Sequence, residues 1–371
     1  MKAVTTLKNL TGKSVLVRID TDVDLDGQKV VDDSRLRAAL PTIRYLLGEG
    51  ASVTLIGHMG RPKGKVVKEL RLEAVAHCLS HLLVPHSHVT VSEEKSDSPV
   101  LATIYQIAKR VVLLENLRFD AGEDADEVEF VNLLAKGHDY FVNESFATAH
   151  RNTASTVGMT KKLPAYAGLR LIDELAHLDL LKNDPKPPFV LIVGGAKVEE
   201  KLGLIDQFLP DVDAVLTGGV VANMLLSASG VDIKDSLIQP ELISVAKRLL
   251  KEGGNKLAIP LDYVWEGQRI ADIGKQTIDL YTTIISDSQT VFWAGDMGIA
   301  EIPAFAKGSE ALAQAIALPH EGVRMVGGGD TAASLKKFNL LEKIDFISTG
   351  GGAALEYLAG KELPGLQALT D

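Results

Sequence analysis

A glycine-rich turn late in the chain has the composition of an anion-binding site. Gly327, Gly328 and Gly329 follow an apolar run and precede Asp330 and Thr331. Glycines let backbone N–H groups approach a phosphate closely, and the N-terminus of a following helix stabilises negative charge. A carboxylate at such a helix start can cap the helix or hold a metal ion that bridges phosphates. An ordinary glycine turn with an aspartate cap has the same pattern, so other parts of the sequence are needed to distinguish a binding site from a structural turn.

A second set of candidate ligands is basic and lies in the first half of the chain. These residues each come shortly after an apolar run or at the start of a helical pattern: Arg35, His58, Arg61, Arg118, His150 and Arg151. Guanidinium groups hold phosphate and carboxylate oxygens through paired hydrogen bonds. The net charge of the whole chain is −10, which argues against nucleic-acid or anionic-membrane binding. We therefore expect a local site for a small anion.

Two lysines in the second half complete the candidate set. Lys197 and Lys201 are four residues apart on a helical stretch that begins at the glycine turn 194–195, so they are expected to share one face. They could serve nucleotide phosphates, or they could pair with Glu199 or Glu200. The sequence by itself leaves both interpretations open.

The elements that position these residues follow from hydrophobic patterning. Ten short apolar runs alternate with helical stretches: 15–19, 53–56, 111–114, 140–142, 189–193, 214–216, 257–259, 290–293, 323–326 and 346–348. Such alternation is typical of α/β proteins whose parallel strands are covered on both faces. Ligands of these sheets bind beyond the carboxyl ends of the strands, where the candidate residues lie.

Length and composition bound the remaining questions. A chain of 371 residues predicts two domains, and the pattern changes near a helix expected at 172–182. The single cysteine, Cys78, excludes an internal disulfide and is typical of a reducing compartment. No signal-peptide pattern or membrane-spanning run is evident, so a cytoplasmic protein is expected.

Taken together and in order, the motifs resemble those of the phosphoglycerate kinase family. The matching stretches are 17–20 (VRID), 32–43 (DDSRLRAALPTI), 57–64 (GHMGRPKG), 114–119 (LENLRF), 148–151 (TAHR), 154–158 (ASTVG), 194–198 (GGAKV), 272–274 (DIG), 327–331 (GGGDT) and 348–353 (STGGGA). Each motif alone is a weak signal, and their ordered combination over nearly the whole chain is a strong one.

The resemblance implies a fold of two doubly wound parallel-sheet domains joined by a hinge helix. It implies a phosphoglycerate-binding domain at 1–168, a nucleotide-binding domain at 169–352 and a tail, 353–371, that returns to the first domain. It also implies reversible phosphoryl transfer from 1,3-bisphosphoglycerate to MgADP, in an interdomain cleft closed by hinge motion. A monomer with small-molecule substrates is expected.

The resemblance also assigns roles to residues. Phosphoglycerate ligands would be Asp20, Thr21, Asp22, Arg35, His58, Met59, Gly60, Arg61, Arg118 and Arg151. Nucleotide ligands would be Lys197, Lys201, Gly274, Glu301, Gly327, Gly328, Gly329, Asp330 and Thr331. Arg35, Lys197, Lys201 and the helix starts at Gly329 and Gly352 would surround the transferred group, and Asp330 would hold Mg²⁺. Phosphoryl transfer needs such alignment and positive charge and no protein nucleophile.

Departures from the family pattern cluster at the expected site. Asp22 replaces a neutral amide and would face an anionic ligand, where repulsion weakens binding unless the carboxylate is turned away or paired. The family's Trp-Asn-Gly-Pro stretch is Trp293-Ala294-Gly295-Asp296 in this chain, and Val220 replaces a glycine. A divergent but active kinase is the main hypothesis.

Two other classes of protein remain as alternatives. One is a binding or regulatory protein that keeps nucleotide affinity and has lost transfer. The other is a dinucleotide oxidoreductase, because 295–300 (GDMGIA) approaches a GxGxxG pattern after an apolar run. That spacing is a weak signal, and no acidic ribose ligand follows at a suitable distance.

Overall fold

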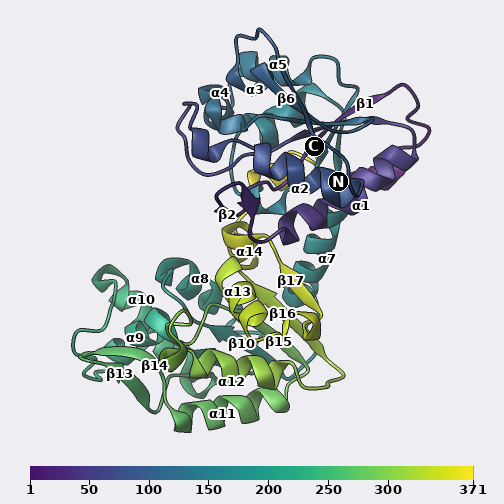
Figure 1. The fold of residues 1–371 in the computed structure, drawn as a ribbon. Coiled ribbons are helices and arrows are strands. Elements are labelled where there is room, and N and C mark those ends of the chain that lie inside the picture. Colours follow the sequence, from purple (N-terminus) through teal and green to yellow (C-terminus); the bar gives the residue numbers. More distant parts are fainter. Residues whose placement is uncertain (371) are drawn as a thin grey trace. The chain divides into compact units, whose positions relative to one another are not determined.

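The computed structural model describes residues 1–370 and confirms the α/β class (Figure 1). The chain divides into two compact units. The first comprises Met1–Leu175 and the segment that begins at Glu362, and the second comprises Ala176–Lys361. No helix within residues 1–370 is long and apolar enough to span a membrane.

The first unit is built on a seven-stranded sheet with the order β5-β6-β7-β4-β1-β8-β9. Its strands are β1 (Ser14–Arg18), β4 (Ser52–Ile56), β5 (Thr90–Glu93), β6 (Thr103–Ala108), β7 (Val111–Leu114), β8 (Tyr140–Asn143) and β9 (Ala165–Ala167). The strands from β7 to β9 pair in parallel, whereas β5 and β6 pair antiparallel at one edge. All four residues of β5 are exposed, so no apolar run marks this edge strand in the sequence.

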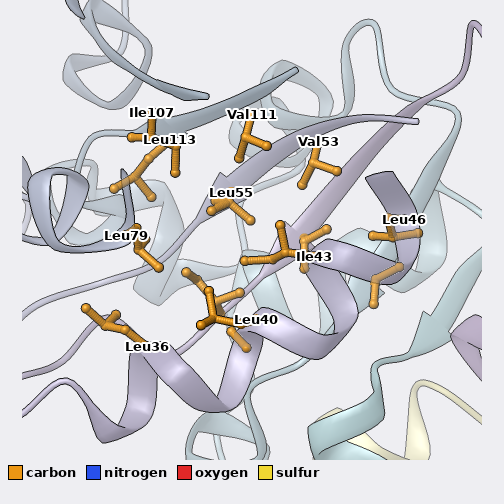
Figure 2. Close-up of a cluster of buried hydrophobic side chains, with 14 of the residues drawn as sticks. Leu36, Leu40, Ile43, Leu46, Val53, Leu55, Leu79, Ile107, Val111 and Leu113 are labelled. Atoms are coloured by element: carbon orange, nitrogen blue, oxygen red, sulfur yellow. The ribbon is translucent and has the colours of Figure 1, made fainter. Parts of the chain in front are cut away.

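Apolar residues on β1 and β4 are buried on both faces of this sheet. Val15 and Val17 belong to one hydrophobic cluster, whereas Leu16 belongs to another on the opposite face. The first cluster includes Leu36, Leu40, Ile43 and Leu46, whose helical spacing puts them on one face of α1 (Ser34–Gly48) against Val53 and Leu55 (Figure 2). Each such side chain contributes about 1.5–3 kcal/mol on burial.

The other elements of the first unit connect these strands. The helices are α2 (Glu73–Leu83), α3 (Pro99–Ala102), α4 (Ala121–Ala125), α5 (Val128–Ala135), α6 (Met159–Lys162) and α15 (Pro364–Gln367). Short helical turns are η1 (Val4–Thr6), η2 (Lys68–Leu70), η3 (Leu117–Phe119), η4 (Phe146–Thr148) and η5 (Ala154–Gly158), and β2 (Leu25–Asp26) with β3 (Lys29–Val30) forms a small hairpin.

The second unit is built on a six-stranded sheet with the order β12-β11-β10-β15-β16-β17. Its strands are all parallel: β10 (Phe189–Val193), β11 (Ala214–Thr217), β12 (Leu257–Ala258), β15 (Thr290–Ala294), β16 (Val323–Gly327) and β17 (Phe346–Ser348). The ten predicted apolar runs are thus all strands. A separate antiparallel hairpin, β13 (Tyr263–Glu266) and β14 (Arg269–Ile273), was not predicted.

Helices cover the second sheet and connect its strands. They are α8 (Val198–Phe208), α9 (Gly219–Ala228), α10 (Ile243–Gly253), α11 (Lys275–Ser286), α12 (Lys307–Ile316), α13 (Gly329–Lys337) and α14 (Gly351–Leu358), with the short turns η6 (Pro240–Leu242), η7 (Gly254–Lys256), η8 (Pro303–Phe305) and η9 (Leu341–Lys343). Residues of α11, α12 and α13 share one core cluster with Val190, Val291 and Val326 of the strands.

The bounds of the two units differ slightly from the predicted domain boundaries at 168/169 and 352/353. The units divide at 175/176, within α7 (Leu169–Asn183), so this helix contributes residues to both. Residues 353–361 belong to the second unit because α14 packs against α8. From Glu362 the chain belongs to the first unit, where the Gly365 amide donates a hydrogen bond to the Ala149 carbonyl (2.8 Å).

Candidate functional site

Most of the predicted phosphoglycerate ligands of the first unit lie on loops that follow four neighbouring strands. In the order β7-β4-β1-β8 these loops carry Arg118, then His58 and Arg61, then Asp20 and Asp22, and then Arg151. Parallel strands end at the same edge of the sheet, so the topology brings these loops together. The four loops lie side by side because their strands are neighbours in the sheet.

His58 lies at the centre of this cluster and is 5% exposed. Its Nδ1 atom accepts a hydrogen bond from Nη2 of Arg18 at 2.6 Å. The pKa of His58 is lowered well below its usual value by burial and by the charges of Arg18, Arg118, Arg151 and Arg35. The ring is therefore neutral at pH 7, and its remaining proton is on Nε2.

Arg18 was not among the predicted site residues, although it is 1% exposed at the end of β1. Its guanidinium donates to the Ile19 carbonyl, and its Nε atom donates to Ser155 Oγ at 3.0 Å. The Ser155 hydroxyl in turn donates to Glu123 at 2.6 Å. An arginine inside an apolar run is a signal that sequence reasoning could have used, because buried charge requires partners.

Arg35 and Asp20 form an ion pair at this sheet edge. Nη1 of Arg35, near the start of α1, lies 2.8 Å from Asp20 Oδ2. Burial raises the pKa of Asp20, and the charges of Arg35 and Arg18 oppose this rise. The Arg35 side chain is 30% exposed, so its remaining donors are open to a ligand.

Arg118 and Arg151 add further positive charge. Arg118 is buried, and its guanidinium donates to the Gly60 carbonyl at 2.7 Å and lies 3.3 Å from Asp124. The pKa of Arg151 is lowered by burial and by the charges of Arg118 and Arg61. Arg118 and Arg61 are thus close enough to Arg151 to repel its charge, and a bound anion would relieve that repulsion.

The neighbouring predicted ligands have different surroundings. Asp22 is turned toward the loop after β4, where its Oδ1 accepts from the Gly60 amide (2.9 Å) and its Oδ2 lies 3.8 Å from His58 Nε2. Thr21 is fully buried and donates to the His58 carbonyl. Met59 is 3% exposed, and its side chain belongs to the hydrophobic core of the unit, so its part in ligand binding stays a prediction.

The second unit contains a cavity of about 330 Å³ at the carboxyl ends of its strands. Its lining comes from the loops after β10 and β15, from α9 and the segment that follows it, from the start of α13 and from the hairpin β13–β14: Gly195, Ala196, Gly219, Val220, Asn223, Leu237, Glu266, Arg269, Ile270, Ala271, Asp272, Gly295, Asp296, Met297, Gly298, Ile299, Glu301 and Asp330. Of the predicted nucleotide ligands, Glu301 and Asp330 line the cavity. Val220, which replaces a glycine of the family pattern, lines it as well.

Close backbone packing shapes this cavity. The Gly195 amide donates to the Asp296 carbonyl, and the Gly219 amide donates to the Met297 carbonyl, both at 2.8 Å. A Cβ atom at Gly194 would overlap the Asp296 carbonyl oxygen. Glycine is therefore required here for the loops after β10 and β15 to meet.

The glycine turn that suggested a phosphate site connects β16 to α13 as expected. Gly328 has a φ of +101°, a conformation that favours glycine. Thr331, 1% exposed, accepts a hydrogen bond from the Gly295 amide at 2.8 Å and so ties the turn to the neighbouring loop. Asp330 is exposed at the start of α13.

The two predicted lysines differ in environment. Lys201 is 6% exposed within α8, and burial lowers its pKa to about 8; the Glu200, Asp330 and Asp296 carboxylates oppose that fall. Lys197 is the exposed residue that precedes α8, and its carbonyl accepts from the Lys201 amide. Neither lysine lines the cavity, although the charges of Asp330 and Asp296 reach Lys201.

Two further predicted positions also lie outside the cavity lining. Gly274 precedes α11, where its amide donates to the Asp262 carbonyl at 2.8 Å. Gly352 is the second residue of α14, and the part of the chain that the structure describes places no cavity-lining residue on that helix.

Asp296, one of the departures from the family pattern, lines the cavity and is 8% exposed. Its Oδ2 accepts from Ser334 Oγ at 3.0 Å, and its Oδ1 has no hydrogen-bond partner in residues 1–370. Burial raises the pKa of Asp296 to about 6, and the charges of Asp330 and Glu301 add to this rise. The cavity is thus lined by several carboxylates.

Within residues 1–370 no three histidine, cysteine, aspartate or glutamate side chains gather into a set that could hold a metal ion. Mg²⁺ typically uses one or two protein carboxylates together with substrate phosphates and water. The exposed carboxylate of Asp330 at the cavity fits an ion that arrives with a nucleotide.

Comparison with known proteins gives one consistent result. A family model described as phosphoglycerate kinase matches residues 4–361. The chain is 43% identical to the phosphoglycerate kinase of Roseiflexus sp. strain RS-1, over 97% of each chain, and 42% identical to that of Chloroflexus aurantiacus strain J-10-fl, over 97% of this chain and 96% of the relative.

Solved structures agree. The chain is similar to phosphoglycerate kinase from Coxiella burnetii, with a TM-score of 0.82 and 35% identity over 98% of each chain. It is also similar to phosphoglycerate kinase from Pyrococcus horikoshii OT3, with a TM-score of 0.84 and 31% identity over 100% of this chain and 98% of the other.

Proposed function

The chain belongs to the phosphoglycerate kinase family, and from that premise we propose how its residues carry out the reaction. The protein is a phosphotransferase with a carboxyl group as acceptor. It transfers a phosphoryl group reversibly between 1,3-bisphosphoglycerate and ADP, which gives 3-phosphoglycerate and ATP in glycolysis.

In our proposal the basic cluster of the first unit binds phosphoglycerate. The main support for this proposal is that Arg35, Arg118 and Arg151 lie close to the neutral His58 at one edge of the sheet. Arginine forks suit the carboxylate and phosphate of this ligand, and His58 Nε2–H offers a further donor. Arg35 would carry charge to the transferred group as well, since phosphoryl transfer depends on such stabilisation.

The cavity of the second unit would bind the nucleotide. Glycine turns at its edge offer backbone amides to phosphates, with Lys201 on the neighbouring helix α8 and Lys197 directly before that helix. Glu301 would accept hydrogen bonds from the sugar, and Asp330 would contribute an oxygen to Mg²⁺. The ion would offset phosphate charge when it is bound there.

Transfer requires the two bound substrates to meet, so we propose that the units move on substrate binding. X-ray scattering of the protein with and without 3-phosphoglycerate and MgATP tests this, and an unchanged radius of gyration would reject it. The protein would act as a cytoplasmic monomer on small molecules.

A coupled assay of the purified chain with 3-phosphoglycerate and MgATP tests the function itself. Turnover above a blank without protein is expected. Tight MgADP binding without any turnover would instead support the regulatory alternative. The oxidoreductase alternative has no structural support, because Gly295–Ala300 continue into a loop and η8, whereas a GxGxxG phosphate site requires a helix at that point.

A further inference from the structure

Glu123 is a buried carboxylate with no role in the family-derived site. It lies in α4 and is 2% exposed. Both of its oxygens accept from Ser155, Oε1 from the hydroxyl at 2.6 Å and Oε2 from the backbone amide at 3.1 Å. Burial raises the pKa of Glu123, and the nearby Arg18 charge and these hydrogen bonds oppose that rise.

Three hydrogen bonds in series connect Glu123 to His58. The first joins Glu123 Oε1 to Ser155 Oγ at 2.6 Å, the second joins Ser155 Oγ to Arg18 Nε at 3.0 Å, and the third joins Arg18 Nη2 to His58 Nδ1 at 2.6 Å. The members lie on α4, η5, β1 and the loop after β4. All four residues are at least nine-tenths buried.

The direction of each bond in this chain follows from the donors and acceptors that its members offer. Ser155 Oγ accepts from Arg18 Nε, so the single hydroxyl proton of Ser155 points to Glu123, and Glu123 thereby holds Arg18 in place through Ser155. A guanidinium only donates, so His58 Nδ1 must accept. Because the imidazole is neutral, its one N–H is then fixed on Nε2.

We propose that Glu123 is a positioning residue that, through Ser155 and Arg18, holds His58 as the Nε2–H tautomer that donates a hydrogen bond to bound phosphoglycerate. This inference rests on the proposed function. The Asp22 carboxylate lies 3.8 Å from the same nitrogen in the free protein, so an acceptor already faces this atom.

The competing explanation is that Glu123 only offsets the buried charge of Arg18. Both explanations predict lower stability when Glu123 is changed. They differ in the tautomer of His58 and in the selective loss of phosphoglycerate affinity, which charge balance alone would not cause.

The test uses full-length protein labelled with ¹⁵N-histidine and the variant Glu123→Gln. Glutamine has an oxygen at only one of the two carboxylate positions, so the hydroxyl and the amide of Ser155 no longer each meet a separate acceptor oxygen, and the contact that holds Arg18 against His58 is weakened. In wild type without substrate we expect ¹⁵N shifts of His58 with the proton on Nε2. In the variant we expect mixed tautomers and a rise of about tenfold in KM for 3-phosphoglycerate, with kcat and the KM for MgATP unchanged.

A matched control is Glu115→Gln. Glu115 is also buried in the first unit, where it accepts from the Leu72 amide and the Tyr105 hydroxyl, and none of its hydrogen bonds among residues 1–370 involves Arg18 or His58. This variant should keep the His58 tautomer. If Glu123→Gln does not fold, Ser155→Ala removes the same link and should give the same shifts.

A wild-type His58 with the proton on Nδ1 would overturn the proposal, as would an unchanged tautomer together with an unchanged KM in Glu123→Gln. The tautomer is measured without substrate, so its outcome is independent of whether the protein is an active kinase.

Discussion

The first unit holds its site together with charged side chains, whereas the second forms its cavity from glycine backbone. Around His58 the arginines bond to carboxylates, to Ser155 and to backbone carbonyls, and two of them, Arg18 and Arg118, are buried. Around the cavity the loops meet through amide and carbonyl groups, and carboxylates outnumber basic residues in the lining. The first site should therefore be sensitive to changes of charge, and the second to any added side-chain atom.

The largest effect is expected from Arg35→Ala. Loss of this guanidinium should lower kcat by about 10²-fold and leave the KM for MgATP unchanged, because in our proposal its charge stabilises the transferred group, and its partner Asp20 lies in the first unit. Steady-state kinetics with each substrate varied separates the two constants. Arg37→Ala is a matched control on the same helix, since Arg37 is 61% exposed and pairs with Asp33. Equal losses in kcat and in nucleotide affinity would contradict the proposal that the two units bind different substrates.

A smaller effect is expected from Gly194→Ala in the second unit. The added Cβ would overlap the Asp296 carbonyl oxygen, so the loops must separate at a cost of about 1–3 kcal/mol. Thermal unfolding should show a lower Tm, and the KM for MgATP should rise about tenfold while that for 3-phosphoglycerate is unchanged. Gly203→Ala is the control, because its Cβ would have only one neighbour, at 4.0 Å. A normal KM in Gly194→Ala would show that backbone packing does not shape the nucleotide site.

A pH effect is expected at Lys201, a buried lysine of the second unit. With its pKa at about 8, the ammonium fraction falls about tenfold between pH 7 and pH 9, so the KM for MgATP should rise by a similar factor. Lys201→Met should have a high KM for MgATP at every pH. Lys197→Met changes an exposed residue, so its KM for MgATP should still rise between pH 7 and pH 9. A flat profile in wild type would mean that the Lys201 charge does not reach the nucleotide.

The smallest effect is expected from Asp22→Asn. Removal of a negative charge beside the basic cluster should tighten 3-phosphoglycerate binding about two- to threefold, a modest gain because the side chain is 44% exposed. The amide oxygen of asparagine can still accept from Gly60. Calorimetric titration measures the change, with Asp24→Asn, two residues along, as control. Unchanged affinity would mean that Asp22 does not act on the ligand.

Sequence patterning sufficed for all six strands of the second sheet and for β1, β4, β7 and β8 of the first, together with the loops at their carboxyl ends, whereas β5, β6 and β9 were not predicted. Continuous apolar runs such as Phe189–Val193 are the direct consequence of burial on both faces. The ordered motifs then identified the family. The exposed edge strand β5 and the hairpin β13–β14 lack such runs, so their sequences contain no comparable signal.

The side-chain contacts of the site could not be predicted in the same way. Arg18 and Ser155 are 137 residues apart, and their hydrogen bond exists only because the fold brings β1 and η5 together. Met59 and Gly274 were assigned by position within a motif, whereas the burial of Met59 and the residues that line the cavity depend on packing. Asp296 shows the reverse case, since the sequence flagged it and the structure places it in the cavity lining.

The chain leaves the first unit within α7 and rejoins it only at Glu362, where α15 follows and Gly365 bonds to Ala149. On the ribosome the entire second unit is therefore synthesised before the last piece of the first unit emerges. A nascent chain can complete its second unit while the first still lacks α15, so the unit that is translated first is the one that finishes folding last.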